Sequence, residues 1–213
     1  MIRKIVIVDY GMGNIKSVQR GLEQVGVTAI LSADPKVIAT ASHLVLPGVG
    51  AFEDGMKGLE EAGLITAILD FVKTGNPLLG ICLGMQMLLD QSEENGKHQG
   101  LGLIPGCVKA IPTNNKNQFI RKIPHIGWND LKPRENQGDW LGTSLADTKI
   151  GEYFYFVHSY MTVVEDSMNI LAQCNYDGVL FSAAIRRNNI TGLQFHPEKS
   201  GESGLKILHR FIN

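Results

Sequence analysis

Pro77-Leu-Leu-Gly-Ile-Cys82-Leu-Gly-Met-Gln86 contains an apolar strand that runs directly into a cysteine, with a helix expected to begin immediately after it. Glycines lie two residues before and two residues after Cys82, which is the G-x-C-x-G form of a nucleophile elbow. The adjacent helix N-terminus favours the negatively charged thiolate. A lone cysteine is more often a buried structural residue, but that alternative does not explain both glycines. The stretch therefore predicts a nucleophilic Cys82 at a sharp strand-to-helix turn.

Strand and helix patterns alternate around this stretch. Strands are predicted for apolar runs at 4–9, 28–31, 43–46 and 78–81. Helices are predicted after a possible N-cap at Asn14, and at 35–40, 64–72 and 83–89. Strands that are apolar on both faces and are separated by amphipathic helices indicate a mostly parallel central sheet with helices on both faces.

The pattern changes beyond residue 100, where strand candidates follow one another closely. They fall at 108–111, 152–158, 170–176, 181–185 and 190–194, and a last helix is predicted at 203–211. Residues 113–142 are rich in Asn, Lys, Pro and Gly and are interpreted as loop. We expect the later strands to extend the sheet with an antiparallel section, within one α/β domain over residues 1–213.

Composition narrows the classes of partner and compartment. A formal charge of -1 and a pI of about 6.6 give no electrostatic reason to expect a nucleic acid or a membrane surface as partner. The apolar run within residues 1–9 is too short for the core of a signal peptide, and no apolar stretch approaches the length of a membrane-spanning helix. Three cysteines without a C-x-x-C pair indicate neither a disulfide framework nor a thiolate zinc site. We therefore expect a cytoplasmic protein without a metal or organic cofactor.

A base and an orienting acid for Cys82 are predicted at His196 and Glu198. His196 follows a predicted strand and precedes Pro197, so that both polar side chains lie at a strand end. A nucleophilic cysteine needs a group that accepts and returns its proton, and a second group that orients that base. His-Pro-Glu alone is equally consistent with a surface turn. Its assignment as base and orienting acid depends on the predicted elbow at Cys82.

A third element is the glycine-rich strand end at Pro47-Gly-Val-Gly50. Glycines there let backbone N–H groups face outward, and the N–H of Leu83 follows the nucleophile, so the two segments are candidates for an oxyanion hole. A phosphate-binding turn is the competing interpretation. It lacks the lysine and hydroxyl of a P-loop, and Gly11-Met-Gly13 lacks the third glycine of a dinucleotide fingerprint.

Seven segments together give the chain a family resemblance over essentially its whole length. It resembles the glutaminase subunits of imidazole glycerol phosphate synthase, which are class I glutamine amidotransferases of histidine biosynthesis with a flavodoxin-like α/β fold. The segments are Asp9-Tyr-Gly-Met-Gly-Asn-Ile-Lys-Ser-Val18, Leu46-Pro-Gly-Val-Gly-Ala-Phe52, Gly80-Ile-Cys-Leu-Gly-Met-Gln86, Gly100-Leu-Gly-Leu-Ile-Pro-Gly106, Pro124-His-Ile-Gly-Trp-Asn129, Tyr155-Phe-Val-His-Ser-Tyr160 and Gln194-Phe-His-Pro-Glu-Lys-Ser-Gly201.

The resemblance implies a glutaminase that forms a heterodimer with a barrel cyclase. Cys82 would attack the amide of L-glutamine, His196 would protonate departing ammonia and then activate water, and Glu198 would orient His196. Ammonia would pass through the barrel, where imidazole glycerol phosphate and AICAR form. The remaining roles implied are an oxyanion hole at Gly48, Val49, Gly50 and Leu83, a glutamine pocket at Gln86, His158, Ser159 and Tyr160, and a partner face at Asn14, Trp128 and Lys199.

Three alternatives remain open at this stage. Segments 173–178 and 184–189 match the family pattern loosely, and some relatives supply ammonia to a cyclase-like synthase of surface-polysaccharide sugars. A partner-independent γ-glutamyl cysteine hydrolase would use the same fold and triad. A non-enzymatic binding module is the third alternative, but such a module has no need of the Cys, His and Glu together.

Overall fold

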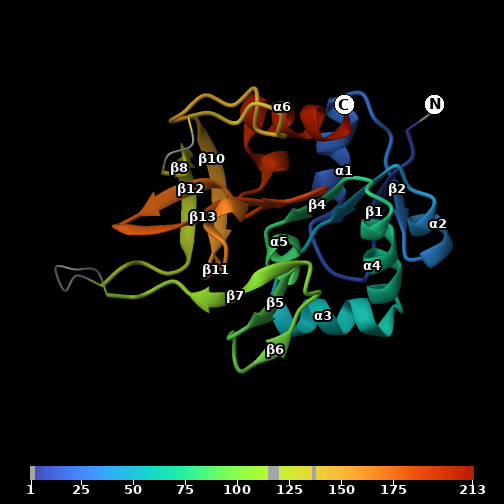
Figure 1. Cartoon of the computed structure of the whole chain (residues 1–213), viewed down its shortest axis with the longest axis horizontal. Coiled ribbons are helices and arrows are strands. Elements are labelled where there is room, and N and C mark those ends of the chain that lie inside the picture. The colour runs from blue at the N-terminus through green and yellow to red at the C-terminus, as the bar shows by residue number, and fades with distance from the viewer. Residues whose placement is uncertain (1–2, 115–119, 136–137) are drawn as a thin grey trace.

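An eight-stranded mixed sheet forms the centre of the computed structural model, which describes residues 3–114, 120–135 and 138–213 (Figure 1). The strand order is β2-β1-β3-β4-β14-β13-β12-β9. The first five strands are parallel to one another, and the last three continue the sheet in antiparallel pairs. In sheet order the strands are β2 Ile30–Ser32, β1 Ile5–Val8, β3 His43–Leu46, β4 Leu78–Ile81, β14 Ile190–Leu193, β13 Val179–Arg187, β12 Ile170–Tyr176 and β9 Lys132–Pro133.

Helices cover both faces of the parallel strands because these strands are apolar on both sides. Ile5 and Ile7 of β1 pack in one cluster with α1 and α6, while Val6 and Val8 pack in a second cluster with the remaining α-helices. This confirms the predicted fold class. The helices are α1 Ile15–Gln24 and α6 Gly201–Ile212 on the first face, and α2 Pro35–Ala39, α3 Phe52–Glu61, α4 Ile65–Lys73 and α5 Leu83–Met87 on the second; η1 Ser167–Asn169 and η2 Pro197–Lys199 are short 3-10 turns.

Two smaller sheets correct part of the predicted topology. Strand candidates 170–176 and 181–185 extend the central sheet, but those at 108–111 and 152–158 do not. The first belongs to a four-stranded sheet of order β11-β7-β5-β6, and the second to a two-stranded sheet of β10 with β8, on the side of the molecule away from β2 and α2 (Figure 1). The strands are β5 Leu89–Ser92, β6 His98–Gln99, β7 Ile104–Ala110, β8 His125–Asp130, β10 Tyr153–His158 and β11 Tyr160–Val164.

The separate placement of β10 has a packing reason. Phe154 and Phe156 are fully buried and join the same apolar cluster as α1 and α6, so this strand lies over the central sheet as an added layer instead of pairing at its edge. Its partner β8 falls in the segment 113–142 that was interpreted as loop, and that interpretation is wrong for β8 and β9. Residues 115–119 and 136–137 of that segment lie outside the described part of the chain.

Backbone contact at the strand-to-helix turn explains its two glycines. Cys82 has φ +55 and ψ -109, which is a left-handed and strained conformation for a residue with a side chain. A Cβ on Gly80 would lie 2.7 Å from the Gly84 carbonyl oxygen, and a Cβ on Gly84 would lie 1.9 Å from the Leu46 carbonyl oxygen. Both positions therefore require glycine, and the turn is the predicted elbow in geometry.

The strand register gathers the polar segments at one edge of the sheet. Leu193 of β14 lies opposite Ile81 of β4, and Leu46 of β3 lies opposite Gly80. The next residues along each strand therefore leave the sheet side by side at the carboxyl ends of parallel strands, which is where α/β folds place ligands. Within residues 3–114, 120–135 and 138–213, every helix is too short or too polar to span a bilayer.

We expect Gly84→Ala to destabilise the chain by more than about 3 kcal/mol, because the added Cβ collides with backbone that has no room to move. Gly138→Ala is the matched control, since a Cβ there meets no atom within 4 Å. Its free energy of unfolding should stay within about 0.5 kcal/mol of the wild type. Chemical denaturation of both variants measures the difference, and equal stabilities would contradict the close approach.

Candidate active site

A cavity of about 390 Å³ opens where the carboxyl ends of β4 and β14 meet the loop after β3 and the end of β10. Cys82 and His196 both line it. Cavities of similar size elsewhere on the described surface, such as one near Arg186 and another near Glu53, contain no cysteine. The first cavity is therefore the one that holds the predicted nucleophile and its base.

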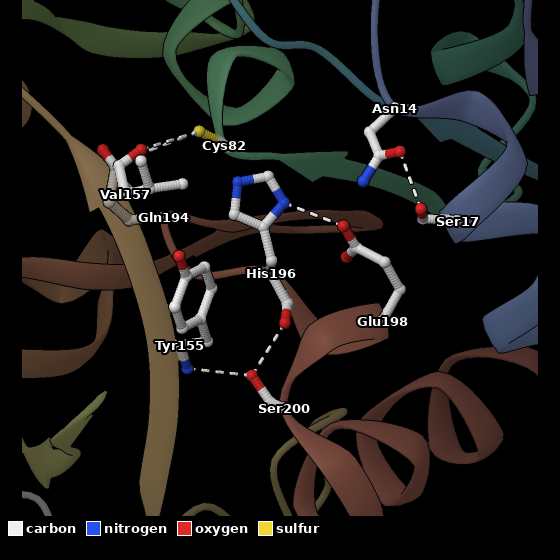
Figure 2. A network of polar contacts seen from close by, with 9 residues as sticks. All are labelled: Asn14, Ser17, Cys82, Tyr155, Val157, Gln194, His196, Glu198 and Ser200. Atoms are coloured by element: carbon white, nitrogen blue, oxygen red, sulfur yellow. Dashed lines mark hydrogen bonds and ion pairs between the residues drawn. The ribbon is translucent and has the colours of Figure 1, made fainter. Parts of the chain in front are cut away.

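Cys82 is fixed by the backbone on both sides of the elbow. Its N–H donates to the Leu193 carbonyl oxygen at 2.7 Å, which ties the elbow to β14. Its Sγ lies 3.9 Å from the Val157 carbonyl oxygen of β10 and 3.8 Å from Nε2 of Gln194 (Figure 2). The sulfur is thus held between β10 and the residue that follows β14, at the wall of the cavity.

His196 lies between Cys82 and Glu198, with its ring buried (Figure 2). Its Nδ1 is 2.8 Å from Oε1 of Glu198, and this carboxylate is itself fully buried. The backbone of His196 is clamped as well, because Ser200 Oγ donates to the His196 carbonyl at 2.7 Å and accepts from the Tyr155 N–H at 3.0 Å. With Nδ1 committed to Glu198, Nε2 is the ring nitrogen available to the cysteine.

The pKa of His196 follows from these neighbours. Burial by itself lowers the pKa of His196, but the Cys82 sulfur and the Glu198 carboxylate together outweigh burial and raise that pKa to about 9. The imidazole is therefore protonated at neutral pH while it faces the sulfur. An imidazolium beside a cysteine is the arrangement that stabilises a reactive thiolate.

Helix α1 supports the carboxylate from behind. A Cβ on Gly21 would lie 3.1 Å from the Glu198 Cβ, so that this glycine lets α1 pack directly on η2. Asn14 stands at the start of α1 (Figure 2). It occupies the N-cap position, but its Oδ1 accepts from Ser17 Oγ at 2.7 Å and makes no capping bond to the backbone.

The Pro47–Gly50 loop packs against the elbow. Val49 and Gly50 line the cavity, and Gly50 has φ +103. Gly48 lies underneath, where a Cβ would be 2.9 Å from the Leu83 Cβ. Leu83 is the first residue of α5, so its N–H has no acceptor within the helix. The four predicted oxyanion-hole positions therefore lie together.

The predicted glutamine-pocket residues also meet at the cavity. Gln86, His158, Ser159 and Tyr160 all line it. The amide Nε2 of Gln86 donates to the Tyr160 carbonyl at 3.1 Å, and His158 Nδ1 donates to the same oxygen at 2.8 Å. These bonds fix the β10–β11 corner against α5.

Two further residues of the site were missed from the sequence. Glu94 lines the cavity and its Oε2 accepts from the Phe52 N–H at 2.8 Å. Gln194 is completely buried behind Cys82. Gln194 precedes His196 by two residues, so the alternation of an extended chain could have placed both on the same side. Nothing in the sequence brings Glu94 to this cavity, because its position depends on the four-stranded sheet.

The predicted partner-face residues lie outside the cavity but close to it. Trp128 is 54% exposed and packs edge-on against Tyr155 of the neighbouring strand at 6.0 Å between ring centroids. Lys199 Nζ lies 6.0 Å from the Tyr155 ring centroid. Tyr155, which was not predicted, therefore joins Trp128 to Lys199 in one surface strip beside the triad.

In the described part of the chain, no group of three or more His, Cys, Asp or Glu side chains is arranged to hold a metal ion. The chemistry that the described side chains support is acyl transfer through cysteine. The predicted nucleophile on its elbow, the buried pair of His196 and Glu198, and the Pro47–Gly50 loop beside Leu83 are the features expected of a cysteine-nucleophile hydrolase.

Comparison with known proteins identifies the kind of hydrolase. A family model described as "Glutamine amidotransferase class-I" matches residues 6–213. "Imidazole glycerol phosphate synthase subunit HisH 1" of Legionella pneumophila strain Lens is 47% identical over 98% of both chains. The HisH subunit of Geobacter sulfurreducens is 48% identical over 98% of this chain and 97% of its own length.

Solved structures agree with the fold at lower identity. A structure described as PurLQS from Thermotoga maritima gives a TM-score of 0.71 at 21% identity, and the match covers 100% of this chain and 99% of that chain. A crystal structure described as a glutamine amidotransferase gives a TM-score of 0.69 at 18% identity, with 97% and 96% covered. The chain belongs to the class I glutamine amidotransferase family. Within it, the chain is a member of the HisH group, as the resemblance predicted.

We expect the imidazole of His196 to titrate near pH 9 in the wild type and at lower pH in Cys82→Ala, because the substitution removes one of the two groups that raise the pKa of His196. Histidine NMR titration measures this directly. His125 and His158 serve as internal references, since burial lowers their pKa values to about 4 and about 3. Cys107→Ser is the control variant, and an unshifted His196 in Cys82→Ala would show that sulfur and imidazole do not interact.

Proposed function

We propose that this chain hydrolyses L-glutamine to glutamate and ammonia as the glutaminase subunit of imidazole glycerol phosphate synthase in histidine biosynthesis. The observation that carries the proposal is the buried pair of His196 and Glu198, with 2.8 Å between Nδ1 and Oε1, set beside Cys82 at the elbow. Membership of the HisH group supports the substrate and the pathway.

The proposed reaction uses each group once in each half. The Cys82 thiolate attacks the side-chain amide carbon of glutamine, and the oxyanion accepts hydrogen bonds from the Leu83 and Val49 N–H groups. His196 then gives its proton to the departing nitrogen, so that ammonia leaves and a γ-glutamyl thioester remains. In the second half, His196 removes a proton from water, the water attacks the thioester, and glutamate leaves as the thiolate reforms. Glu198 keeps the imidazole oriented throughout.

Reorientation of the oxyanion loop is proposed at the peptide between Gly48 and Val49, because this peptide carries the Val49 N–H. Gly50 already has φ +103, and a Cβ there would meet only the flexible end of Met12. Gly48 and Gly50 flank Val49 and are proposed to permit the rotation. A Cβ on Gly48 would lie 2.7 Å from the Tyr10 hydroxyl and 2.9 Å from the Leu83 Cβ, so the close packing there needs glycine. Burial raises the pKa of Tyr10, so its hydroxyl stays a donor to the Pro47 carbonyl at 2.8 Å and anchors the near end of the loop. A partner that moves Val49 could therefore complete the oxyanion hole.

Recognition of glutamine is proposed for the lining residues of the cavity that do not belong to the Pro47–Gly50 loop. The amide N–H groups of Gln86 donate to Tyr160 and Gln194, which leaves the Gln86 Oε1 as an acceptor. Glu94 is the carboxylate among the residues that line the cavity, and it suits the ammonium group of an amino acid. Ser159 and the Tyr160 corner close the site.

The partner is proposed to be a barrel cyclase that forms a heterodimer with this chain. The strip of Trp128, Tyr155 and Lys199 offers a large exposed aromatic and a cation next to the predicted triad. Asn14, at the start of α1, is proposed to belong to the same partner face. Free ammonia is mostly protonated at neutral pH, so transfer through the partner's interior keeps it nucleophilic. The cyclase would use it to form imidazole glycerol phosphate and AICAR, and the complex would be cytoplasmic.

Glutaminase rate, measured with and without the cognate barrel cyclase and its ribonucleotide substrate, tests the proposal. We expect at least about a hundredfold stimulation by the loaded partner together with formation of imidazole glycerol phosphate, because one oxyanion-hole donor is worth about 2.7–4 kcal/mol. Cys82→Ala should lose more than about a thousandfold in rate. Cys107→Ser, which changes a thiol outside the cavity, should keep the wild-type rate.

The other outcomes identify the alternatives. Stimulation only by a synthase of polysaccharide sugars would indicate that the ammonia serves that pathway. Full activity without any partner would favour an independent γ-glutamyl hydrolase. Trp128→Ala should weaken stimulation but leave the partner-free rate unchanged. Unchanged stimulation in this variant would remove Trp128 from the proposed partner face.

A further inference from the structure

A glutamine side chain lies fully buried behind the nucleophile. Gln194 has no exposed surface, and its Nε2 is 3.8 Å from Sγ of Cys82 (Figure 2). Its Oε1 accepts from Nε2 of Gln86 at 3.1 Å. It does not line the cavity, so it has no contact with a substrate bound there.

We infer that Gln194 is a positioning residue for the nucleophile. Its side-chain amide donates a hydrogen bond that stabilises the thiolate of Cys82 and holds the sulfur beside His196. The inference rests on the proposed glutaminase function for its place in catalysis. The geometry that supports it is independent of the substrate.

The two polar contacts of the sulfur correspond to its two protonation states. A carbonyl oxygen only accepts, so the Val157 oxygen at 3.9 Å is a partner for the neutral thiol alone. A thiolate only accepts, so it needs a donor, and the Gln194 amide at 3.8 Å is placed to be one. Without this donor, the negative sulfur would face the Val157 carbonyl oxygen with the His196 imidazolium as its one stabilising neighbour among the groups described above, and a buried charge with too few partners is costly.

A chain of hydrogen bonds fixes which end of the Gln194 amide faces the sulfur. The Gln86 Nε2 donates to both Gln194 Oε1 and the Tyr160 carbonyl, so the oxygen of Gln194 must face Gln86 and its nitrogen must face Cys82. His158 Nδ1 donates to the same Tyr160 carbonyl, and its Nε2 lies 3.0 Å from Nδ1 of His125.

The far end of this chain does not titrate at working pH. Burial lowers the pKa of both His125 and His158 far below neutrality, so both rings stay uncharged. His125 is held further by stacking on Tyr176 at 4.0 Å and on Phe156 at 5.0 Å between centroids. The amide that faces Cys82 is therefore anchored to a rigid set of neutral groups.

The test compares Gln194→Met, Gln194→Glu and the control Gln173→Met, which makes the same change on β12, outside the cavity lining. Two readouts are followed against pH: alkylation of Cys82 by iodoacetamide, located by peptide mass, and glutaminase kcat/KM with the partner. Met removes the donor, and Glu places a negative charge beside the sulfur. Thermal unfolding checks that each variant folds.

Loss of one hydrogen bond to a charged group predicts a fall in kcat/KM of about ten- to a hundredfold for Gln194→Met. The acidic limb of both profiles should move to higher pH, because the thiolate is then harder to form. The shift should be larger for Gln194→Glu and absent for Gln173→Met. If Gln194→Met disturbs folding, the direction in which the acidic limb moves in Gln194→Glu still tests the inference.

An unshifted acidic limb in folded Gln194 variants, even with lower activity, would overturn the inference and leave a packing role. The role of Gln194 and the proposed glutaminase function are tested by different readouts. Alkylation does not use glutamine, so a shifted alkylation profile in a chain without glutaminase activity would keep the role of Gln194 and reject the proposed function.

Discussion

The backbone conformation of Cys82 is the constraint on which the site depends. A side chain at φ +55 costs about 1–3 kcal/mol of local strain, and the chain accepts it only because Gly80 and Gly84 allow three backbone segments to meet. The same contact brings the Leu46 carbonyl, and hence the Pro47–Gly50 loop, against the start of α5. Cys82 and the Pro47–Gly50 loop, the proposed nucleophile and oxyanion loop, are therefore positioned by one close approach.

Buried charge is the second organising feature. His196 and Glu198 are both almost completely buried, and an isolated charge there would be expensive. The pair offsets that cost internally, and α1 and Ser200 hold it from two sides. His196, the proposed base, thus keeps its orientation without help from substrate, which suits a site whose remaining adjustment is proposed at Val49.

Local sequence predicted the parts of the molecule that depend on local rules. The alternation of apolar strands and helices, the elbow glycines and the strand-end position of His196 are all short-range patterns, and the parallel core and the gathered triad follow from them. The sheets of β7 and β10 could not be predicted in this way. Apolar strand residues such as Ile104 and Phe156 give the same sequence pattern in a strand that extends the central sheet and in one that lies over it. Glu94 and Tyr155 reach the site only through those sheets. Helix α3 was missed because its two internal glycines weaken the helical pattern.

The most direct test of the account is to trap the covalent intermediate. Glutamine would be mixed with the complex of this chain and its barrel partner, quenched in acid, and the peptide that carries Cys82 would be weighed by mass spectrometry. The account predicts a γ-glutamyl group on Cys82 that appears with glutamine, disappears as glutamate forms, and is absent from Cys107 and Cys174. Turnover without any such adduct, or an adduct on another residue, would contradict the assignment of Cys82 as the nucleophile.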